Sequence, residues 1–444
     1  MFNIASRIDR LPSTPMLRKI LALCGIGWLF DAMDQGMVSG VMAAIGKDWA
    51  LSTSQLGMFG SSAMLGMILG AALSGMAADR WGRRSVITVT LVIYGIASAL
   101  SGFSVNFPML LILRFLTGFG LGGELPAAST LVSEYSPTKI RGRNVIILES
   151  FWAWGWIAAA LVAYLLIPVY GWRIGFWVGA VPALFAAYLR KAVPESPRYL
   201  ELKGKDKEAD ALVSKMEKEA GITYNHESSD TEMQMSKEHV SFLDLWSKKY
   251  RRSTIVLWVI WFGLNFGYYG FVLWTPSLLV GKGFALVKSF EFTLIMCLAQ
   301  LPGYFSAAYL VEKIGRKKVL VVYLLGTALA AWLFGHAGST NEVLAYGCLL
   351  YFFSLGAWGC TYAYTPEVYP TVARASGSGW ASAFGRIGAF IAPMIVPVIY
   401  TAYGKEAGYT NVFIMLTAVF AIVAVVVGIL GKETMGKTLE EISN

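Results

Sequence analysis

Charged residues are scarce in this chain, and their scarcity argues against an ordinary soluble protein. Asp, Glu, Lys and Arg together make up 15% of the 444 residues, whereas hydrophobic residues make up 56%. A soluble globular protein carries about a quarter charged residues. Here the apolar residues gather in long blocks, so we predict an all-α integral membrane protein whose main surroundings are a lipid bilayer.

Histidine and cysteine are also rare, which removes the usual ingredients of a metal site or a catalytic cluster. The chain has three His and four Cys residues. The cysteines lie within apolar blocks without close pairing, at Cys24, Cys297, Cys348 and Cys360. This spacing favours small core residues over a disulfide or metal framework. We therefore expect no metal, no cofactor and no enzymatic activity.

One segment, GFGLGG at residues 118–123, formally fits the dinucleotide-binding fingerprint GxGxxG. That fingerprint requires a preceding strand, and here the glycines lie within one continuous apolar helix. Small residues in a membrane helix allow another helix to approach closely. We interpret the segment as a packing surface and not as a cofactor site.

The apolar blocks number about twelve, and each is long enough for the roughly 20 residues with which a helix crosses a bilayer core. The predicted spans are residues 17–44, 54–78, 85–104, 107–133, 144–168, 172–192, 253–280, 288–311, 318–337, 341–365, 376–402 and 410–430. One long polar stretch divides them into six and six. We predict an N-terminal half at 1–193, a linker at 194–252 and a C-terminal half at 253–444, with an amphipathic helix over 201–220.

The net charge of +9 would fit a nucleic-acid-binding protein only if the cations shared one surface. They lie instead in alternate loops, as in residues 80–84 after the second span and 313–318 after the eighth. The intervening loops carry only about five cations, which follows the positive-inside rule. We predict cytoplasmic termini and no nucleic-acid partner. The first sixteen residues are polar, so we expect no removable signal peptide.

The two halves share a short pattern at equivalent places. Residues 75–84 read GMAADRWGRR after the second span, and residues 307–317 read AAYLVEKIGRK after the eighth. An acid, a base, a glycine and a cluster of bases recur in the same order. Such a duplication predicts two pseudo-symmetric six-helix halves with the substrate site near the bilayer midplane between them.

Several motifs resemble those of a known transporter superfamily. Residues 66–84 resemble the signature that follows the second helix of major facilitator proteins. Four further segments resemble motifs of its sugar-porter branch. They are SEYSPTKIRGR at 133–143, PESPRYL at 194–200, TPEVYPTVAR at 365–374 and KETMGKTLEEI at 432–442, the last of which lacks the family's first proline. The resemblance spans nearly the whole chain. It implies a twelve-helix major facilitator fold, alternating access and a functional monomer.

The charged residues of these motifs are expected to form cytoplasmic gates. Ion pairs between them would break and form again as the transporter changes conformation. The residues are Asp79, Arg80, Arg83, Arg84, Glu134, Arg143, Glu312, Arg316, Glu367 and Arg374. The alternative is that the bases only anchor the cytoplasmic ends of the helices, as the positive-inside rule requires.

A narrower resemblance concerns the substrate. The segments similar to bacterial niacin permeases are GGELPAASTLVSE at 122–134, LESFWAWGW at 148–156, AQLPGYFSAAYLVEKIGRK at 299–317, LGAWGCTYAYTPEVYPT at 355–371 and AFGRIG at 383–388. These permeases are distant relatives of organic ion transporters and synaptic vesicle glycoproteins. The resemblance implies uptake of nicotinate, a small aromatic monocarboxylate, across a bacterial inner membrane. Transport of a sugar, another aromatic acid or an organic cation remains open, as does a membrane sensor.

Charged side chains inside the predicted spans are few, and each costs at least about 2.5 to 3.5 kcal/mol at the bilayer centre. They are Asp31, Asp34, Arg114, Glu124, Glu149 and Arg386. At 1.5 Å per helical residue, Asp34 and Arg114 fall at similar depths. We predict an ion pair in which protonation of the acid couples a proton to the conformational change. Asp31 is a rival for this role, and a static structural pair is the alternative.

Arg386 is expected roughly 14 Å deep, near the bilayer midplane. No acid is adjacent to it in the sequence. Its planar guanidinium matches a carboxylate in a bidentate arrangement, so a substrate anion can supply the counter-charge. Resemblance to anion transporters, which have an arginine at a similar place, supports this role. The alternative is a pair with Glu149 or another buried acid.

A pyridine ring also needs flat surfaces and one hydrogen-bond donor. Glu149 and Trp156 share a face two turns apart and match substrate-contacting positions of sugar porters. The expected aromatic contacts are Trp156, Tyr268, Tyr269 and Tyr362. Asn265 or Gln300 is expected to hydrogen-bond the ring nitrogen. Ordinary helix packing is the alternative for each aromatic residue.

Overall fold

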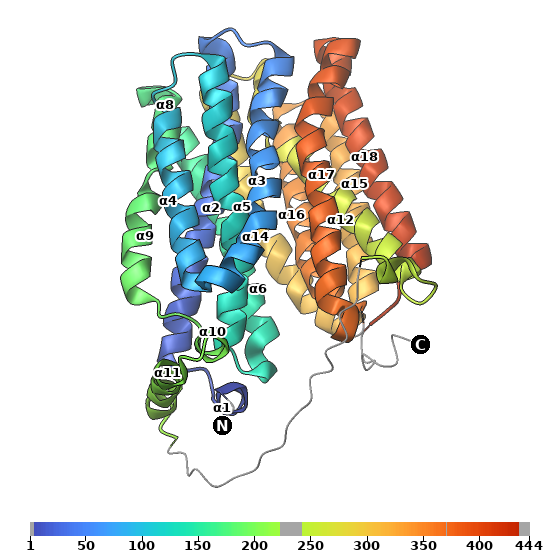
Figure 1. The fold of residues 1–444 in the computed structure, drawn as a ribbon. Helices are drawn as coiled ribbons and strands as arrows, with labels where there is room; N and C mark the ends of the chain where they lie inside the picture. Colours follow the sequence, from blue (N-terminus) through green and yellow to red (C-terminus); the bar gives the residue numbers. More distant parts are fainter. Residues whose placement is uncertain (1–3, 223–241, 370, 435–444) are drawn as a thin grey trace. The chain divides into compact units, whose positions relative to one another are not determined.

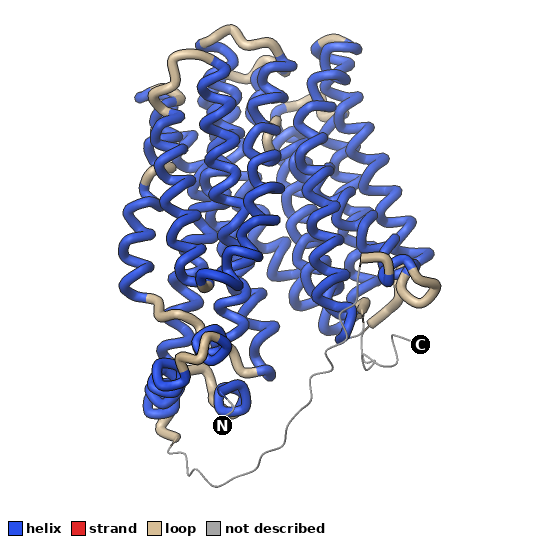
Figure 2. The backbone as a smooth tube through the Cα atoms, in the orientation of Figure 1, coloured by secondary structure: helices blue, strands red, loops and turns tan. Residues whose placement is uncertain are grey.

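The computed structural model describes residues 4–222, 242–369 and 371–434, and helices dominate that part of the chain (Figure 1). Figure 2 shows the same backbone as helices and loops, and no strand occurs in these ranges. Within them, eight helical segments are long and apolar enough to cross a membrane, judged by length and composition.

The first half of the chain forms five long helices, α2 to α6, after a short N-terminal one, and then three shorter helices. They are α1 (Ile4–Asp9), α2 (Pro15–Asp48), α3 (Thr53–Trp81), α4 (Arg83–Ser101), α5 (Phe107–Tyr135), α6 (Thr138–Leu165), α7 (Ile167–Tyr170), α8 (Arg173–Val178) and α9 (Val181–Ala192). The described part of the linker holds α10 (Pro197–Leu202), α11 (Asp206–Glu219) and the 3₁₀ helix η1 (Asp244–Trp246).

The second half continues in the same way. Its helices are α12 (Arg251–Val272), α13 (Thr275–Gly281), α14 (Leu286–Ile314), α15 (Arg316–Gly335), α16 (Thr340–Tyr364), the 3₁₀ helix η2 (Thr365–Glu367), α17 (Thr371–Tyr403) and α18 (Lys405–Leu430). Among them, α12 packs against α17, α14 against α16, and α15 against both α16 and α18.

Every predicted span falls on a helix or on two consecutive helices. The sixth span is divided between α8 and α9, and the seventh between α12 and α13. Pro182 and Pro276 stand in the first turn of α9 and α13. Proline lacks a backbone N–H and favours the first helical turn, which explains why new helices begin there.

The amphipathic linker helix predicted over residues 201–220 is confirmed as α11, which begins later than expected. Gly204 has a φ of 71°, a left-handed conformation that separates α10 from α11. The apolar side chains Ala209, Val213 and Met216 are buried on one face of α11. Linker residues 223–241 lie outside the described part.

Contacts within the chain define two compact units. The first contains Met1–Gln35, Leu65–Ala159 and Arg173–Gln234, and the second contains Gly36–Met64, Ala160–Trp172 and Met235–Asn444. The second unit therefore includes the C-terminal part of α2 and the N-terminal part of α3. In it, Ser39 Oγ donates to the carbonyl oxygen of Val272 at 3.0 Å, and Ser61 Oγ to that of Phe390 at 2.8 Å. The halves predicted at 1–193 and 253–444 stay a prediction.

The glycines of α3 and α5 bring these two helices into backbone contact. A Cβ atom at Gly70 would lie 2.0 Å from the carbonyl oxygen of Phe119, and one at Gly66 would lie 2.1 Å from that of Phe115. From the other side, a Cβ at Gly122 would lie 2.2 Å from the carbonyl oxygen of Met67. The segment at residues 118–123 thus lies within α5 and serves as a packing surface.

Gly70→Val is expected to lower the melting temperature of the purified protein, because overpacking of a tight contact costs about 1 to 3 kcal/mol. The melting temperature is measured in detergent micelles by intrinsic fluorescence. Gly428→Val is the matched control, since a Cβ atom at Gly428 on α18 meets nothing within 4 Å. Equal melting shifts for the two variants would contradict the close α3–α5 contact.

Candidate functional site

Asp34 on α2 and Arg114 on α5 form a two-pronged ion pair within the first unit. Arg114 Nη2 lies 2.8 Å from Asp34 Oδ2, and Nη1 lies 3.2 Å from Oδ1. Ser98 on α4 donates a third hydrogen bond to Asp34 Oδ1 at 2.9 Å. The side chains are almost completely buried, with residue exposures of 3% for Asp34 and 0% for Arg114. The structure thus brings together the two residues that were predicted to lie at similar depths in the bilayer.

The surroundings of this pair leave little room for movement. The Arg114 guanidinium carbon lies 5.5 Å from the centre of the Phe176 ring on α8. A Cβ atom at Gly179 would lie 2.3 Å from Ser98 Oγ and 3.2 Å from Asp34 Oδ1. Asp31, the rival acid, is fully buried one turn earlier on α2. The desolvation of two charges is offset here by bidentate geometry and an extra hydrogen bond.

A group of aromatic residues with one acid lies on α2 and α6 in the first unit. Glu149 and Trp156, both predicted to contact substrate, are buried on α6. Between them in the sequence, Trp152 packs on Trp28 of α2 with ring centres 4.8 Å apart. The indole N–H of Trp28 is buried and has no hydrogen-bond partner within the described residues. Trp152 was recognised in the sequence as a residue of this helix without a predicted contact, whereas Trp28 was not singled out.

A larger aromatic cluster joins α12 and α16 in the second unit. Trp358 lies 5.6 Å from Trp261 and 5.7 Å from Tyr362 between ring centres. Tyr268 lies 6.3 Å from Trp358 and 5.5 Å from Tyr269. Tyr268, Tyr269 and Tyr362 were predicted, whereas Trp358 was missed even though its motif was noted. Trp358 lies one turn before Tyr362 on α16, whereas Tyr268 and Tyr269 lie on α12, and sequence spacing does not show that these two helices pack together.

Gln300 on α14 carries a buried amide without hydrogen-bond partners in the described part of the chain. Its exposure is 0%, and neither its amide nitrogen nor its amide oxygen has a hydrogen-bond partner within the described residues. Ser354 on α16 is equally buried and its hydroxyl also has no partner there. Asn265, the other candidate for the ring nitrogen, donates to the carbonyl oxygen of Trp261 at 2.7 Å. Asn265 therefore uses its amide nitrogen for a hydrogen bond within its own helix, whereas no described residue bonds the amide of Gln300.

Gln300 and Ser354 lie at heights along α14 and α16 that differ by about one helical turn. A Cβ atom at Gly347 would lie 2.2 Å from the methyl carbon of Met296, and one at Gly303 would lie 2.1 Å from the carbonyl oxygen of Phe352. Ser354 also stands one turn before Trp358 of the aromatic cluster on α16. Of the two unsatisfied polar groups, Ser354 thus shares a helix with Trp358 of the aromatic cluster, and Gln300 lies on the helix α14 that packs against it.

Arg386 on α17 belongs to the same unit and is partly exposed. Next to it, a Cβ atom at Gly385 would lie 2.7 Å from Asn265 Nδ2 and 2.9 Å from the carbonyl oxygen of Trp261. Arg386 therefore follows a glycine that packs against Trp261, a member of the aromatic cluster. Glu149, its predicted alternative partner, belongs to the first unit.

The predicted gate of the first half contains a salt bridge and a capped helix. Arg83 Nη2 lies 3.2 Å from Glu134 Oε1. Glu195 Oε1 accepts hydrogen bonds from the backbone amides of Arg83 at 3.1 Å and Arg84 at 3.2 Å. Gly82 precedes them with a φ of 94°, and a Cβ atom there would lie 2.2 Å from Glu195 Oε2. The Glu195 carboxylate therefore binds the positive N-terminal end of α4.

The second half repeats this arrangement. Arg316 Nε lies 3.1 Å from Glu367 Oε2, and its Nη2 lies 3.2 Å from Glu312 Oε1. Glu433 Oε1 accepts from the backbone amide of Arg316 at 2.9 Å, after Gly315 with a φ of 108°. Glu195 and Glu433 were not singled out from the sequence, although both belong to motifs quoted there.

The structure describes some of the other residues predicted for the gates and not the rest. Arg80 is exposed and its guanidinium carbon lies 5.9 Å from the centre of the Trp81 ring, while Arg84 donates to the carbonyl oxygen of Arg190. The side chains of Asp79, Arg143 and Arg374, and that of the buried-acid candidate Glu124, lie outside what the structure describes. Among the residues it does describe, no group of three or more His, Cys, Asp or Glu could hold a metal ion.

The buried pair predicts a specific pattern of stabilities. Arg114→Met leaves the Asp34 carboxylate without its counter-charge and is expected to destabilise the protein by about 3 to 5 kcal/mol. Adding Asp34→Asn removes the unpaired charge and should recover much of that loss. The melting temperatures of the two single variants and the double variant form the cycle. Additive losses in the double variant would contradict a direct charge interaction.

Comparison with known proteins places the chain in a family. A family model described as sugar (and other) transporter matches residues 29–444. The niacin transporter NiaP of Acinetobacter baylyi is 47% identical over 99% of this chain and 99% of its own length. The putative niacin/nicotinamide transporter NiaP of Bacillus subtilis is 44% identical over 95% of this chain and 98% of its own length.

Solved structures agree on the fold. A D-xylose-proton symporter superposes with a TM-score of 0.77 at 21% identity, covering 96% of this chain and 100% of the symporter. The inward-open xylose transporter XylE from E. coli gives a TM-score of 0.74 at 22% identity, covering 96% of this chain and 99% of the transporter. The protein is therefore a multi-pass membrane protein of the sugar (and other) transporter family, with the all-helical major facilitator fold.

Proposed function

We propose that this protein imports nicotinate into a bacterial cell by proton symport. It would work as a monomer in the cytoplasmic membrane with both termini in the cytoplasm. The relatives named as niacin transporters, at 47% and 44% identity over nearly full length, support the substrate. The observation that carries the proposal is the chemistry of the second unit, where a cation, an aromatic cluster and an unsatisfied amide occur together.

Each part of that chemistry suits one part of nicotinate. The carboxylate pairs with the guanidinium of Arg386, which offers a planar fork of donors. The pyridine ring lies against the aromatic cluster that contains Tyr268, Trp358 and Tyr362, because flat apolar rings stack favourably. The ring nitrogen accepts a hydrogen bond from the amide of Gln300, whose own partners are missing within the described residues. A sugar would instead require many polar partners around its hydroxyl groups.

The remaining predicted contacts, Glu149 and Trp156, belong to the first unit. In a major facilitator protein with parallel halves, the substrate site lies between the halves near the midplane. We propose that both residues contact the substrate, as the resemblance to sugar porters implies. Asn265 contributes less directly in this proposal, because its amide already donates to Trp261.

Proton coupling is assigned to Asp34 and Arg114. Protonation of Asp34 neutralises the carboxylate, so the electrostatic attraction that holds the Arg114 guanidinium against it is lost. The three helices that meet at the pair, α2, α4 and α5, can then shift relative to one another. The gate pairs Arg83–Glu134 and Arg316–Glu367 support a protein that cycles between conformations, which a static sensor would not need.

Arg386→Ala is expected to weaken nicotinate uptake by roughly tenfold to a hundredfold at low substrate concentration, because a hydrogen bond to a charged group contributes about 1.5 to 3 kcal/mol. Uptake of radiolabelled nicotinate into proteoliposomes measures the effect. Lys288→Ala is the control, since Lys288 is exposed and pairs with Glu291. Unchanged uptake by Arg386→Ala would mean that the anion is bound elsewhere.

Gln300→Leu is expected to reduce the preference for nicotinate over benzoate by about tenfold, because benzoate has the carboxylate and ring but no ring nitrogen. Competition by each acid against labelled nicotinate gives the preference. Asn265→Leu serves as the comparison and should change it less. If Asn265→Leu abolished the preference and Gln300→Leu did not, Asn265 and not Gln300 would bind the ring nitrogen.

A further inference from the structure

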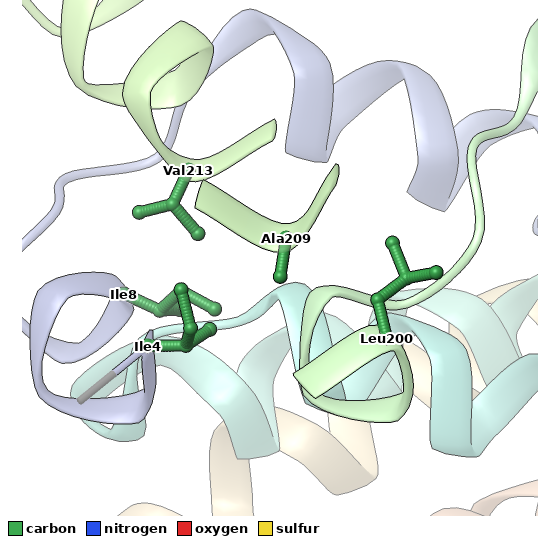
Figure 3. Packing of buried hydrophobic residues seen from close by; sticks show 5 residues of the cluster. All are labelled: Ile4, Ile8, Leu200, Ala209 and Val213. Carbon is green, nitrogen blue, oxygen red and sulfur yellow. The ribbon is translucent and has the colours of Figure 1, made fainter. Parts of the chain in front are cut away.

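The short helix α1 docks on the two linker helices through a small apolar cluster. Ile4 and Ile8 of α1 contact Leu200 of α10 and Ala209 and Val213 of α11, and all five are buried (Figure 3). In addition, the carboxylate of Glu201 on α10 accepts a hydrogen bond from the backbone amide of Ile4. A six-residue helix is not stable alone in water, so α1 depends on these contacts for its structure.

Arg7 lies at the centre of this contact as a buried cation. Its Nε and Nη2 donate to Glu217 Oε1 and Oε2 at 2.8 and 2.7 Å. The same guanidinium donates to Asp210, and to Ser214 Oγ at 3.0 Å. Arg7 is only 6% exposed. Four hydrogen bonds to one helix fix both the position and the direction of α1 on α11.

The docked segment is also tied to the ends of two long helices. Asp9 Oδ1 lies 3.6 Å from Arg141 Nη2, in the first turns of α6. On the other side, Glu219 of α11 accepts a hydrogen bond from the backbone amide of Met16 at 2.9 Å, at the start of α2. The same α2 carries Asp34. Thus α1 and α11 connect the linker to α2 and α6 within the first unit.

The linker helix α10 leads directly to the gate. Tyr199 precedes Leu200 of the apolar cluster, and its hydroxyl donates to the carbonyl oxygen of Arg80 at 3.1 Å. The Arg83 guanidinium carbon lies 5.1 Å from the centre of the Tyr199 ring. Four residues earlier, Glu195 binds the N-terminus of α4. The helix α10 therefore contacts α1 through Leu200 and the gate through Tyr199, and Glu195, just before α10, also contacts the gate.

We infer that α1 (Ile4–Asp9) is a positioning element that holds α10, and with it Glu195 and Tyr199, against the Arg83–Glu134 gate. Arg7 is the positioning residue of this element. It does not belong to the substrate site, and its role is independent of which substrate is carried. Loss of the contact lets α10 move away from the gate, so the conformational cycle slows while substrate affinity is kept.

The test compares full-length Arg7→Ala with Lys215→Ala, an exposed residue on α11 that serves as the control. Amide hydrogen exchange over residues 195–219 is expected to become about tenfold or more faster in Arg7→Ala only, because the ion pairs that fasten α1 are lost. In proteoliposomes the maximal uptake rate should fall about tenfold with an unchanged KM. Ile8→Ala, which keeps the ion pairs, should act in the same direction and more weakly.

Two results would overturn the inference. Exchange in α10 that stays at the wild-type level in both Arg7→Ala and Ile8→Ala would mean that α1 does not hold the linker. Faster exchange with an unchanged maximal rate would mean that the contact is only structural. The exchange measurement needs no substrate, so it decides the first point even if nicotinate is not transported.

Discussion

The salt bridge between Asp34 and Arg114 imposes the strongest constraint on the first unit. Two charges with almost no exposure to solvent are stable only while each satisfies the other, since the desolvation cost is not otherwise recovered. Their bidentate contact fixes α2 relative to α5, and the Ser98 hydroxyl adds α4. Gly179 must remain a glycine for the chain to pass beside them. A single protonation at Asp34 would therefore affect the packing of several helices at once.

The two halves use the same physical solution where their helices begin. After a glycine in the left-handed region, a glutamate from a distant motif accepts hydrogen bonds from the first backbone amides of α4 and of α15. An arginine of that first turn then pairs with a glutamate near the end of another helix, Glu134 or Glu367. The recurrence of both features extends the sequence duplication to individual hydrogen bonds. It also links the linker and the C-terminal segment to the predicted gates.

The sequence predicts those features that depend on local pattern. Long apolar runs define the helices, and Pro182 and Pro276 explain why two spans are divided. The depth of a residue in the membrane follows from its position along its own helix, so Asp34 and Arg114 could be matched although they are 80 residues apart. Contacts that depend on side-chain direction could not be predicted. Both Asn265 and Gln300 are polar residues in apolar helices, and only the structure distinguishes the amide that bonds its own helix.

Contacts between remote segments were missed for a related reason. Arg7 and Glu217 are separated by 210 positions, and each looks in the sequence like one charge among many in a polar region. Trp358 and Ser354 both lie on α16. Their roles in a site could be recognised only once α12 and α14 were seen to pack beside that helix. Periodicity shows which residues face inward, but it does not show which helix they face.

The most direct test of the account is nicotinate accumulation in proteoliposomes, measured with and without an inward proton gradient for the wild type and for Asp34→Asn. Xylose and an organic cation serve as control substrates. The account predicts that the wild type concentrates nicotinate only when the gradient is present, and that Asp34→Asn can equilibrate nicotinate without concentrating it. Accumulation at full strength by Asp34→Asn, or a wild type indifferent to the gradient, would contradict proton coupling through the Asp34–Arg114 pair.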